Sequence, residues 1–77
     1  GEGSETAKEE RRRRAQLQQL ENTIAALEAR LAELGGALES PPADPARVVQ
    51  LGREYAQAQT QMDEKLGEWE KLQAEMA

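Results

Sequence analysis

The sequence predicts an all-α fold, a two-helix antiparallel coiled-coil hairpin, and three observations support this. Apolar residues recur at alternating spacings of three and four along both halves of the 77-residue chain, which places them on one stripe of a helix. A short proline-containing break separates the halves and leaves room only for a reversal of direction. Ala, Glu, Lys, Leu and Arg supply more than half of the residues, as is typical of coiled coils.

The predicted elements follow from where this periodicity starts and stops. Residues 1–6 lack apolar periodicity and contain two glycines, so we expect a flexible N-terminal segment there. The remaining residues, 7–77, form one hairpin domain. Its parts are a helix over 7–39, a turn over 40–44 and a helix over 45–76.

Proline chemistry sets the limits of the turn. Ser40 precedes Pro41, and the residue before a proline is disfavoured in helical geometry. Pro42 prevents the helix from continuing. Asp44 is suited to cap the second helix, with Pro45 at the first helical position, where no amide hydrogen is required.

The apolar stripe of each helix, which we call the seam, is expected to pair with the other. Its members are Leu17, Leu20, Ile24, Leu27, Leu31, Leu34, Leu38, Val48, Leu51, Tyr55, Met62, Leu66, Trp69 and Leu72. Antiparallel pairing about the two prolines predicts that the numbers of facing residues sum to about 86. This register places Tyr55 opposite Leu31 and Leu66 opposite Leu20. It leaves Leu72 facing Arg13.

Three places depart from an ideal seam. Gly35-Gly36 costs about 1 kcal/mol per glycine relative to alanine and predicts either a loosened last turn or a hinge. Lys65 takes a seam position beside Leu66, which suggests a local slip of the heptad. Trp69 is interpreted as a core residue, with a base-stacking platform as the alternative.

Charge is distributed unevenly. The net charge is −5, yet residues 8–14 hold five positive and two negative side chains. These cations either form a solvated, partly ion-paired helix end or contact phosphate groups of DNA or RNA. The candidate nucleic-acid-binding residues are Lys8, Arg11, Arg12, Arg13, Arg14, Arg47 and Arg53.

Composition excludes several other functions. The chain has no cysteine and no histidine, which removes disulfides, thiol or imidazole catalysis and the usual zinc sites. No apolar run reaches the roughly 18 residues of a membrane span, so we expect a cytoplasmic protein. We identify no catalytic residues, metal ligands or cofactor site, because a two-helix rod offers no concave site for catalytic carboxylates.

Residues 20–72 resemble a known family. The relevant segments are the first-helix run IAALEARLAEL, the turn SPPADPARV and the second-helix run LGREYAQAQTQMDEKLGEWEKL. Within them, Asp44-Pro45, Glu54-Tyr55 and Trp69-Glu70-Lys71-Leu72 carry the likeness. The sequence is similar to the C-terminal coiled-coil domain of ABC-F ATPases, in particular the Uup-like branch.

The resemblance implies that the chain is the tail of a protein with two ATP-binding cassettes. It contains no Walker A glycine loop, so ATP and magnesium are expected in the parent and not in this fragment. Membership of the Uup-like branch implies DNA binding, whereas other members of the family act on the ribosome. Arg30, Lys65 and Lys71 add to the candidate phosphate contacts.

Two alternative functions stay open from the sequence. One is a structural spacer or dimerisation coiled coil without a nucleic-acid role, which the negative net charge favours. The other is the tRNA-contacting arm of an aminoacyl-tRNA synthetase, since that of valyl-tRNA synthetase is also a helical hairpin. We expect a monomeric hairpin, with self-association as an open alternative, and an accessory role without enzymatic activity.

Overall fold

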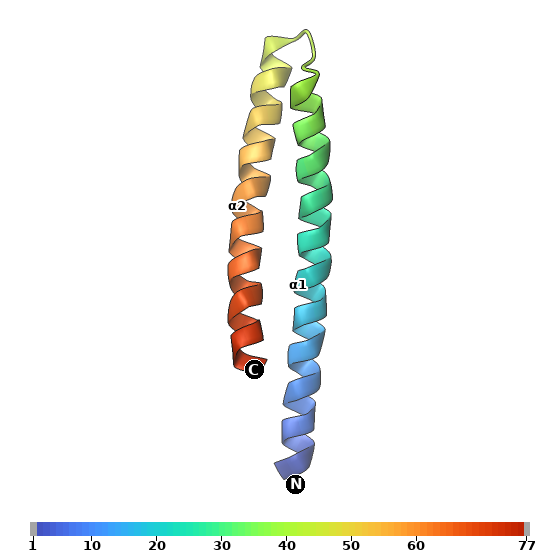
Figure 1. The fold of residues 1–77 in the computed structure, drawn as a ribbon, viewed down its shortest axis with the longest axis vertical. Helices are drawn as coiled ribbons and strands as arrows, with labels where there is room; N and C mark the ends of the chain where they lie inside the picture. The colour runs from blue at the N-terminus through green and yellow to red at the C-terminus, as the bar shows by residue number, and fades with distance from the viewer. Residues whose placement is uncertain (1, 77) are drawn as a thin grey trace.

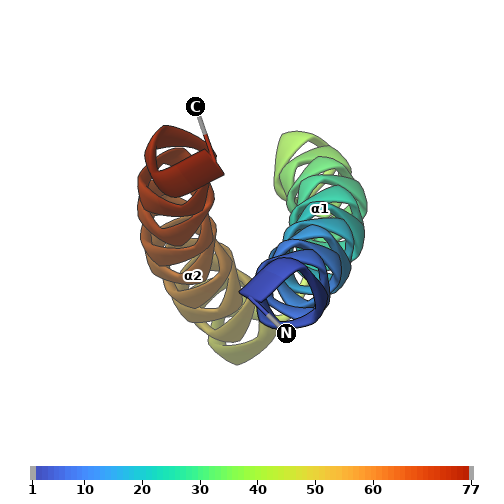
Figure 2. The same cartoon turned by 90° about the horizontal axis from the view of Figure 1, so that it is seen from below.

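The fold is an antiparallel pair of long helices (Figure 1) in a computed structural model that describes residues 2–76. Helix α1 runs over Glu2–Glu39 and helix α2 over Pro45–Met76. They form a rod of 64 × 16 × 14 Å and wind around each other when viewed end-on (Figure 2). The predicted all-α hairpin is confirmed.

The helix boundaries agree with those predicted at the turn and differ at the N-terminus. Helix α1 ends at Glu39 and α2 spans Pro45–Met76, as the prolines and the periodicity predict. At the other end, α1 begins at Glu2 and not at Ala7. Propagating an existing helix adds one backbone hydrogen bond for each residue ordered, and this is sufficient to continue α1 without apolar residues. Gly1 lies outside the described residues.

Asp44 caps α2 as predicted. Its Oδ1 accepts a hydrogen bond from the backbone N–H of Ala46 at 3.1 Å. Its carbonyl oxygen accepts bonds from the N–H groups of Arg47 at 3.1 Å and Val48 at 3.2 Å. The cap therefore satisfies donors of the first turn that have no partner within the helix.

The contacts across the hairpin are displaced from the predicted register by up to one helical turn. A Cβ atom built on Gly35 would lie 3.7 Å from Cε2 of Tyr55, and Trp69 contacts Glu21. Both pairs have residue numbers that sum to 90 and not 86. Prolines favour an extended backbone of about 3.1 Å per residue. The connection accordingly rises past the end of α1 before joining α2, instead of reversing at the prolines (Figure 1).

The core of the hairpin lies near the turn. Leu34, Leu51 and Ala58 are buried there, with exposed fractions of 6%, 4% and 2%. The half-buried Leu31, Ala37, Leu38 and Tyr55 pack against them. Farther from the turn the buried seam residues are Leu27, Met62 and Leu72. The remaining predicted members are half-buried, except for Leu66.

The prediction that Leu66 belongs to the seam is wrong. Leu66 is 39% exposed, whereas Lys65 is half-buried. The spacing Met62, Lys65, Trp69 preserves the alternation of three and four, so α2 keeps its heptad and accepts a lysine in the seam. The Lys65 ammonium group reaches Glu68 at 3.1 Å, which lets the methylene stem lie against apolar surface while the charge stays solvated.

Helix α1 continues through Gly35-Gly36 without a break. Helical structure extends to Glu39, and the N–H of Ser40 still bonds to the carbonyl of Gly36 at 3.2 Å. An added Cβ at Gly35 would make an ordinary contact with Tyr55, and one at Gly36 would meet open space. Neither glycine is therefore required by packing in this conformation.

Candidate nucleic-acid interface

The four consecutive arginines do not act as one group, because successive helix positions are about 100° apart. Arg13 is half-buried and lines a depression of about 280 Å³ with Glu10, Arg14, Glu75 and Met76. It therefore lies at the junction between α1 and the end of α2. Leu72, which the sequence places opposite Arg13, lies elsewhere.

Arg14 is turned toward its own helix. Its Nη2 lies 3.6 Å from Oε2 of Glu10, one turn earlier, and both side chains are more than half exposed. Such a pair contributes only about 0.3–0.5 kcal/mol. Arg14 is thus partly neutralised but free to exchange its partner at little cost.

Lys8, Arg11 and Arg12 form the part of the run that is both exposed and unpaired among the described side chains. Their spacing of three and four places them on one face of α1. All three are exposed, and none takes part in an ion pair among the side chains that the structure describes, residues 6–76. This part of α1 extends beyond the end of α2 (Figure 1). The three residues, which we call the cationic face, present the most concentrated unpaired positive charge among residues 6–76.

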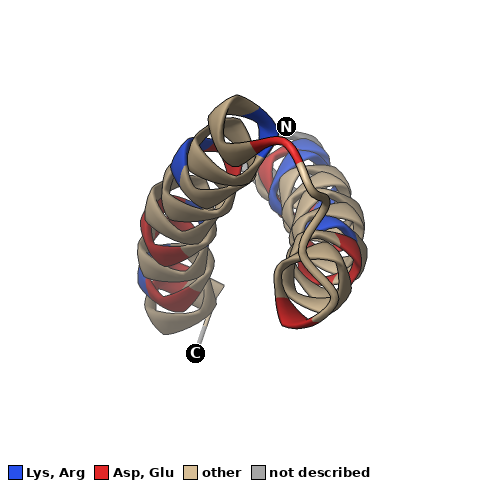
Figure 3. Ribbon diagram, turned by 90° about the horizontal axis from the view of Figure 1, so that it is seen from above, with Lys and Arg blue, Asp and Glu red and all other residues tan. Residues whose placement is uncertain are grey.

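The other candidate cations are scattered. Arg47 and Arg53 are exposed in the first turns of α2, close to the hairpin turn and far along the rod from the cationic face. Arg30 and Lys71 are exposed on different helices, and Lys65 is paired with Glu68. Acidic segments are interspersed with basic ones along both helices (Figure 3). The structure does not bring the candidate cations together into one patch.

Both aromatic residues belong to the hairpin interior. Tyr55 packs against the core cluster, and Trp69 is half-buried in the seam. The indole N–H of Trp69 donates to Oε1 of Glu21 on α1 at 3.5 Å. The chain has no other Trp or Tyr and no Phe. No exposed aromatic side chain is therefore present on which a base could stack.

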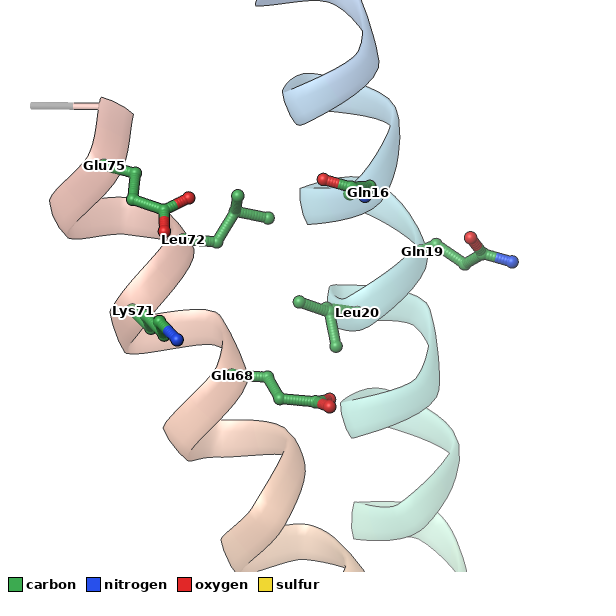
Figure 4. A pocket seen from close by; sticks show the side chains of 7 residues that line it. All are labelled: Gln16, Gln19, Leu20, Glu68, Lys71, Leu72 and Glu75. Atoms are coloured by element: carbon green, nitrogen blue, oxygen red, sulfur yellow. The ribbon is translucent and has the colours of Figure 1, made fainter.

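A shallow groove lies between the helices where the seam weakens. It measures about 390 Å³ and is lined by Gln16, Gln19, Leu20, Glu68, Lys71, Leu72 and Glu75. Leu20 and Leu72 point into the space between the helices, whereas Gln19 points away from α2 (Figure 4). Leu72 is buried here, one turn from its predicted position beside Arg13. The groove is open and mixed in polarity, so it lacks the enclosed apolar walls of a small-molecule site.

Neither a cluster of metal-binding side chains nor a membrane-spanning helix is found among the described residues. No group of three or more His, Cys, Asp or Glu side chains within the described part of the chain is arranged to hold a metal ion. None of the helices among residues 2–76 has the length and apolar character needed to cross a bilayer.

Two features of this region were missed by sequence reasoning. The Trp69–Glu21 hydrogen bond and the Leu20–Leu72 groove both depend on the register between the helices. Heptad spacing fixes which side of each helix is apolar but not how far one helix slides along the other. Only the path of the connection between the helices supplies that information.

Comparison with known proteins agrees with the fold. Residues 8–74 match the family model described as the ABC transporter C-terminal domain. No curated protein and no solved structure gives a significant match. The matched family consists of accessory domains and not of catalytic ATPase modules. The match also argues against the alternative that the chain is the arm of an aminoacyl-tRNA synthetase. Because the match covers most of the chain, this protein belongs to the ABC transporter C-terminal domain family.

Proposed function

We propose that this domain attaches an ABC-F ATPase of the Uup-like branch to nucleic acid, with duplex DNA as its first ligand. In this proposal the cationic face of α1 contacts backbone phosphates. The parent supplies the ATP-binding cassettes, and with them ATP and magnesium. The domain itself performs no catalysis and works in the cytoplasm.

The sequence elements at the turn and at the end of α2 support the choice of the ABC-F class. Asp44-Pro45 forms the cap of α2, and Glu54-Tyr55 brings an aromatic residue to the core cluster. Trp69 lies in the seam with Leu72 following one turn later. These are the elements in which the chain resembles the Uup-like domain, and each has a defined place in the hairpin.

The cationic face is the observation that carries the nucleic-acid proposal. Lys8, Arg11 and Arg12 are exposed and unpaired among the described side chains. Phosphate contacts need cations that are not already neutralised, and arginine binds phosphate with two parallel N–H donors. Arg13 and Arg14 are less available for phosphate contacts, because Arg13 is half-buried and Arg14 is ion-paired.

The net charge of −5 limits how strongly such an interface can bind. Three phosphate contacts give a dependence of log K on log salt of about −2.7 on duplex DNA. Repulsion from the acidic remainder of the hairpin weakens binding further. We therefore expect a weak contact that becomes effective through tethering, since a linked domain experiences a high effective concentration of its target.

The proposal is tested by titrating a DNA duplex, and separately a ribosomal RNA helix, with the domain at about 50 mM salt, where phosphate contacts are strongest. The variant Arg11→Gln/Arg12→Gln should weaken binding and reduce the magnitude of the salt slope by about 2, close to 0.9 per contact. Fluorescence anisotropy of a labelled duplex over a range of salt concentrations measures both quantities.

The matched control is Arg13→Gln/Arg14→Gln, which removes the same amount of charge from the neighbouring positions. It should change the slope by less than half as much, because these side chains are half-buried or paired. Equal effects of the two variants would assign binding to general charge. No binding by the unmodified domain at low salt would leave a structural spacer as the better function.

A further inference from the structure

One exposed face of the hairpin carries charges of opposite sign in a self-complementary order. Along α1 this face runs through Arg11, Arg14, Gln18, Glu21, Ala25 and Glu28, at spacings of three and four. All six are exposed. The positive residues precede Gln18 and the negative residues follow it, so a second copy laid antiparallel would place each sign against the other.

Helix α2 extends the acidic part of this face. The Trp69–Glu21 hydrogen bond joins the two helices here, and Asp63, Leu66 and Glu70 follow one stripe of α2 at spacings of three and four. Leu66 is among the few large apolar side chains that are strongly exposed, at 39%. An exposed leucine between two carboxylates suits a cationic helix whose methylene stems cover the leucine.

We propose that this face binds a second copy of the chain, in an antiparallel and two-fold symmetric arrangement centred near Gln18. In this pairing Arg14 faces Glu21 of the other copy, and Arg11 lies between Glu21 and Glu28 of that copy. The stem of Arg11 lies over Leu66. Each contact occurs twice, because a two-fold interface uses the same surface on both copies.

The charges make this a weak, salt-sensitive association. Exposed ion pairs contribute about 0.2–1 kcal/mol each and are screened by salt. Arg14 can leave Glu10 for a partner on the other copy with little loss, since that pair is long and exposed. The turn end of the hairpin, with Arg47 and Arg53, is not part of the contact.

Charge reversal on either half of the face tests the proposal without nucleic acid, so its failure would leave the proposed function untouched. Sedimentation equilibrium of the unmodified chain at about 20 mM salt, where the Debye length exceeds about 20 Å, should give a mass that rises with concentration from 8.5 kDa toward twice that value. At about 0.5 M salt the mass should return to that of the monomer.

The variants Arg11→Glu/Arg14→Glu and Glu21→Arg/Glu28→Arg should each remain monomeric, because like charges then face each other. An equimolar mixture of the two should associate, because along α1 one copy then carries only acids on this face and the other only cations. The control Arg30→Glu/Lys71→Glu reverses two charges away from the face and should associate like the unmodified chain. Circular dichroism verifies that all variants keep their helix content.

Three results would overturn the inference. The unmodified chain could stay at 8.5 kDa at low salt and high concentration. The reversed variants could associate as well as the unmodified chain does. The mixture could remain monomeric although both variants are folded.

Discussion

The seam is packed more completely in the half of the hairpin near the turn than in the half that holds the chain ends. Near the turn, Leu34, Leu51 and Ala58 are buried and the half-buried Tyr55 closes the seam. Toward the chain ends, the seam includes Lys65 and a tryptophan bonded to a glutamate, and Leu20 and Leu72 line an open groove between the helices. The first half supplies stability, and the second presents charged and incompletely covered surface.

This difference places the two proposed interactions in the half that contributes less to stability. Substitutions on the cationic face should therefore affect binding without unfolding the domain, whereas core substitutions near the turn should unfold it. We expect the largest loss in the free energy of unfolding from a core substitution near the turn, and this loss shows the difference in stability between the halves most clearly.

Leu51→Ala should cause the largest loss, about 3 kcal/mol, because truncating a buried leucine removes apolar contacts and leaves a cavity. Leu51 is only 4% exposed and belongs to the core cluster. Chemical denaturation followed by circular dichroism measures the change. The same truncation at the exposed Leu66, which lies outside the seam, should cost less than about 0.5 kcal/mol, and equal losses at the two positions would show that burial in the seam does not set the cost.

Lys65→Leu should stabilise the half near the chain ends by about 1–2 kcal/mol, because an apolar side chain at this seam position buries more surface than a lysine stem. The lost ion pair with Glu68 is exposed and offsets little of this gain. Thermal unfolding measures the shift in Tm. A destabilised variant would indicate that Lys65 lies outside the seam and that the heptad slips there.

Asp44→Ala should cost about 1 kcal/mol through loss of the N-terminal cap of α2. The carboxylate accepts the N–H of Ala46, and alanine offers no side-chain acceptor to replace it. Asp44→Asn preserves an acceptor and should retain most of the stability in the same denaturation assay. If alanine and asparagine behaved alike, the hydrogen bond would not be contributing.

Gly35→Ala should give the smallest change, a stabilisation of up to about 1 kcal/mol from helix propensity. The new methyl group would meet Tyr55 at an ordinary contact distance. Gly36→Ala is the matched control, since its Cβ would meet open space and gain only the propensity term. A loss of stability on Gly35→Ala would show that the glycine is needed for a bend absent from this conformation.

Much of the fold can be predicted from spacing and from proline chemistry. Alternation of three and four identifies the seam faces, and Asp44-Pro45 predicts where α2 starts. The register could not be predicted because it depends on how far the connection travels before α2 begins. That error also misplaced Leu72 relative to Arg13.

The candidate site could be predicted only in part. Residue types identify a basic run at 8–14, but they do not separate the unpaired face from the half-buried Arg13 and the paired Arg14. Leu66 was assigned to the seam because it is apolar, whereas the adjacent Lys65 is charged. Continuity of the heptad excludes it, since a stripe follows spacing and a lysine stem can fill a seam position.

The register determines which residues of the two helices meet, and a single set of nuclear Overhauser effects tests it most directly. If the helices pair with residue numbers that sum to 90, the ring protons of Tyr55 should show strong effects to the α-protons of Gly35, because a Cβ at Gly35 would lie 3.7 Å from the ring. Absence of that contact, with the ring instead centred on Leu31, would contradict this pairing and restore the register in which the chain reverses at its two prolines.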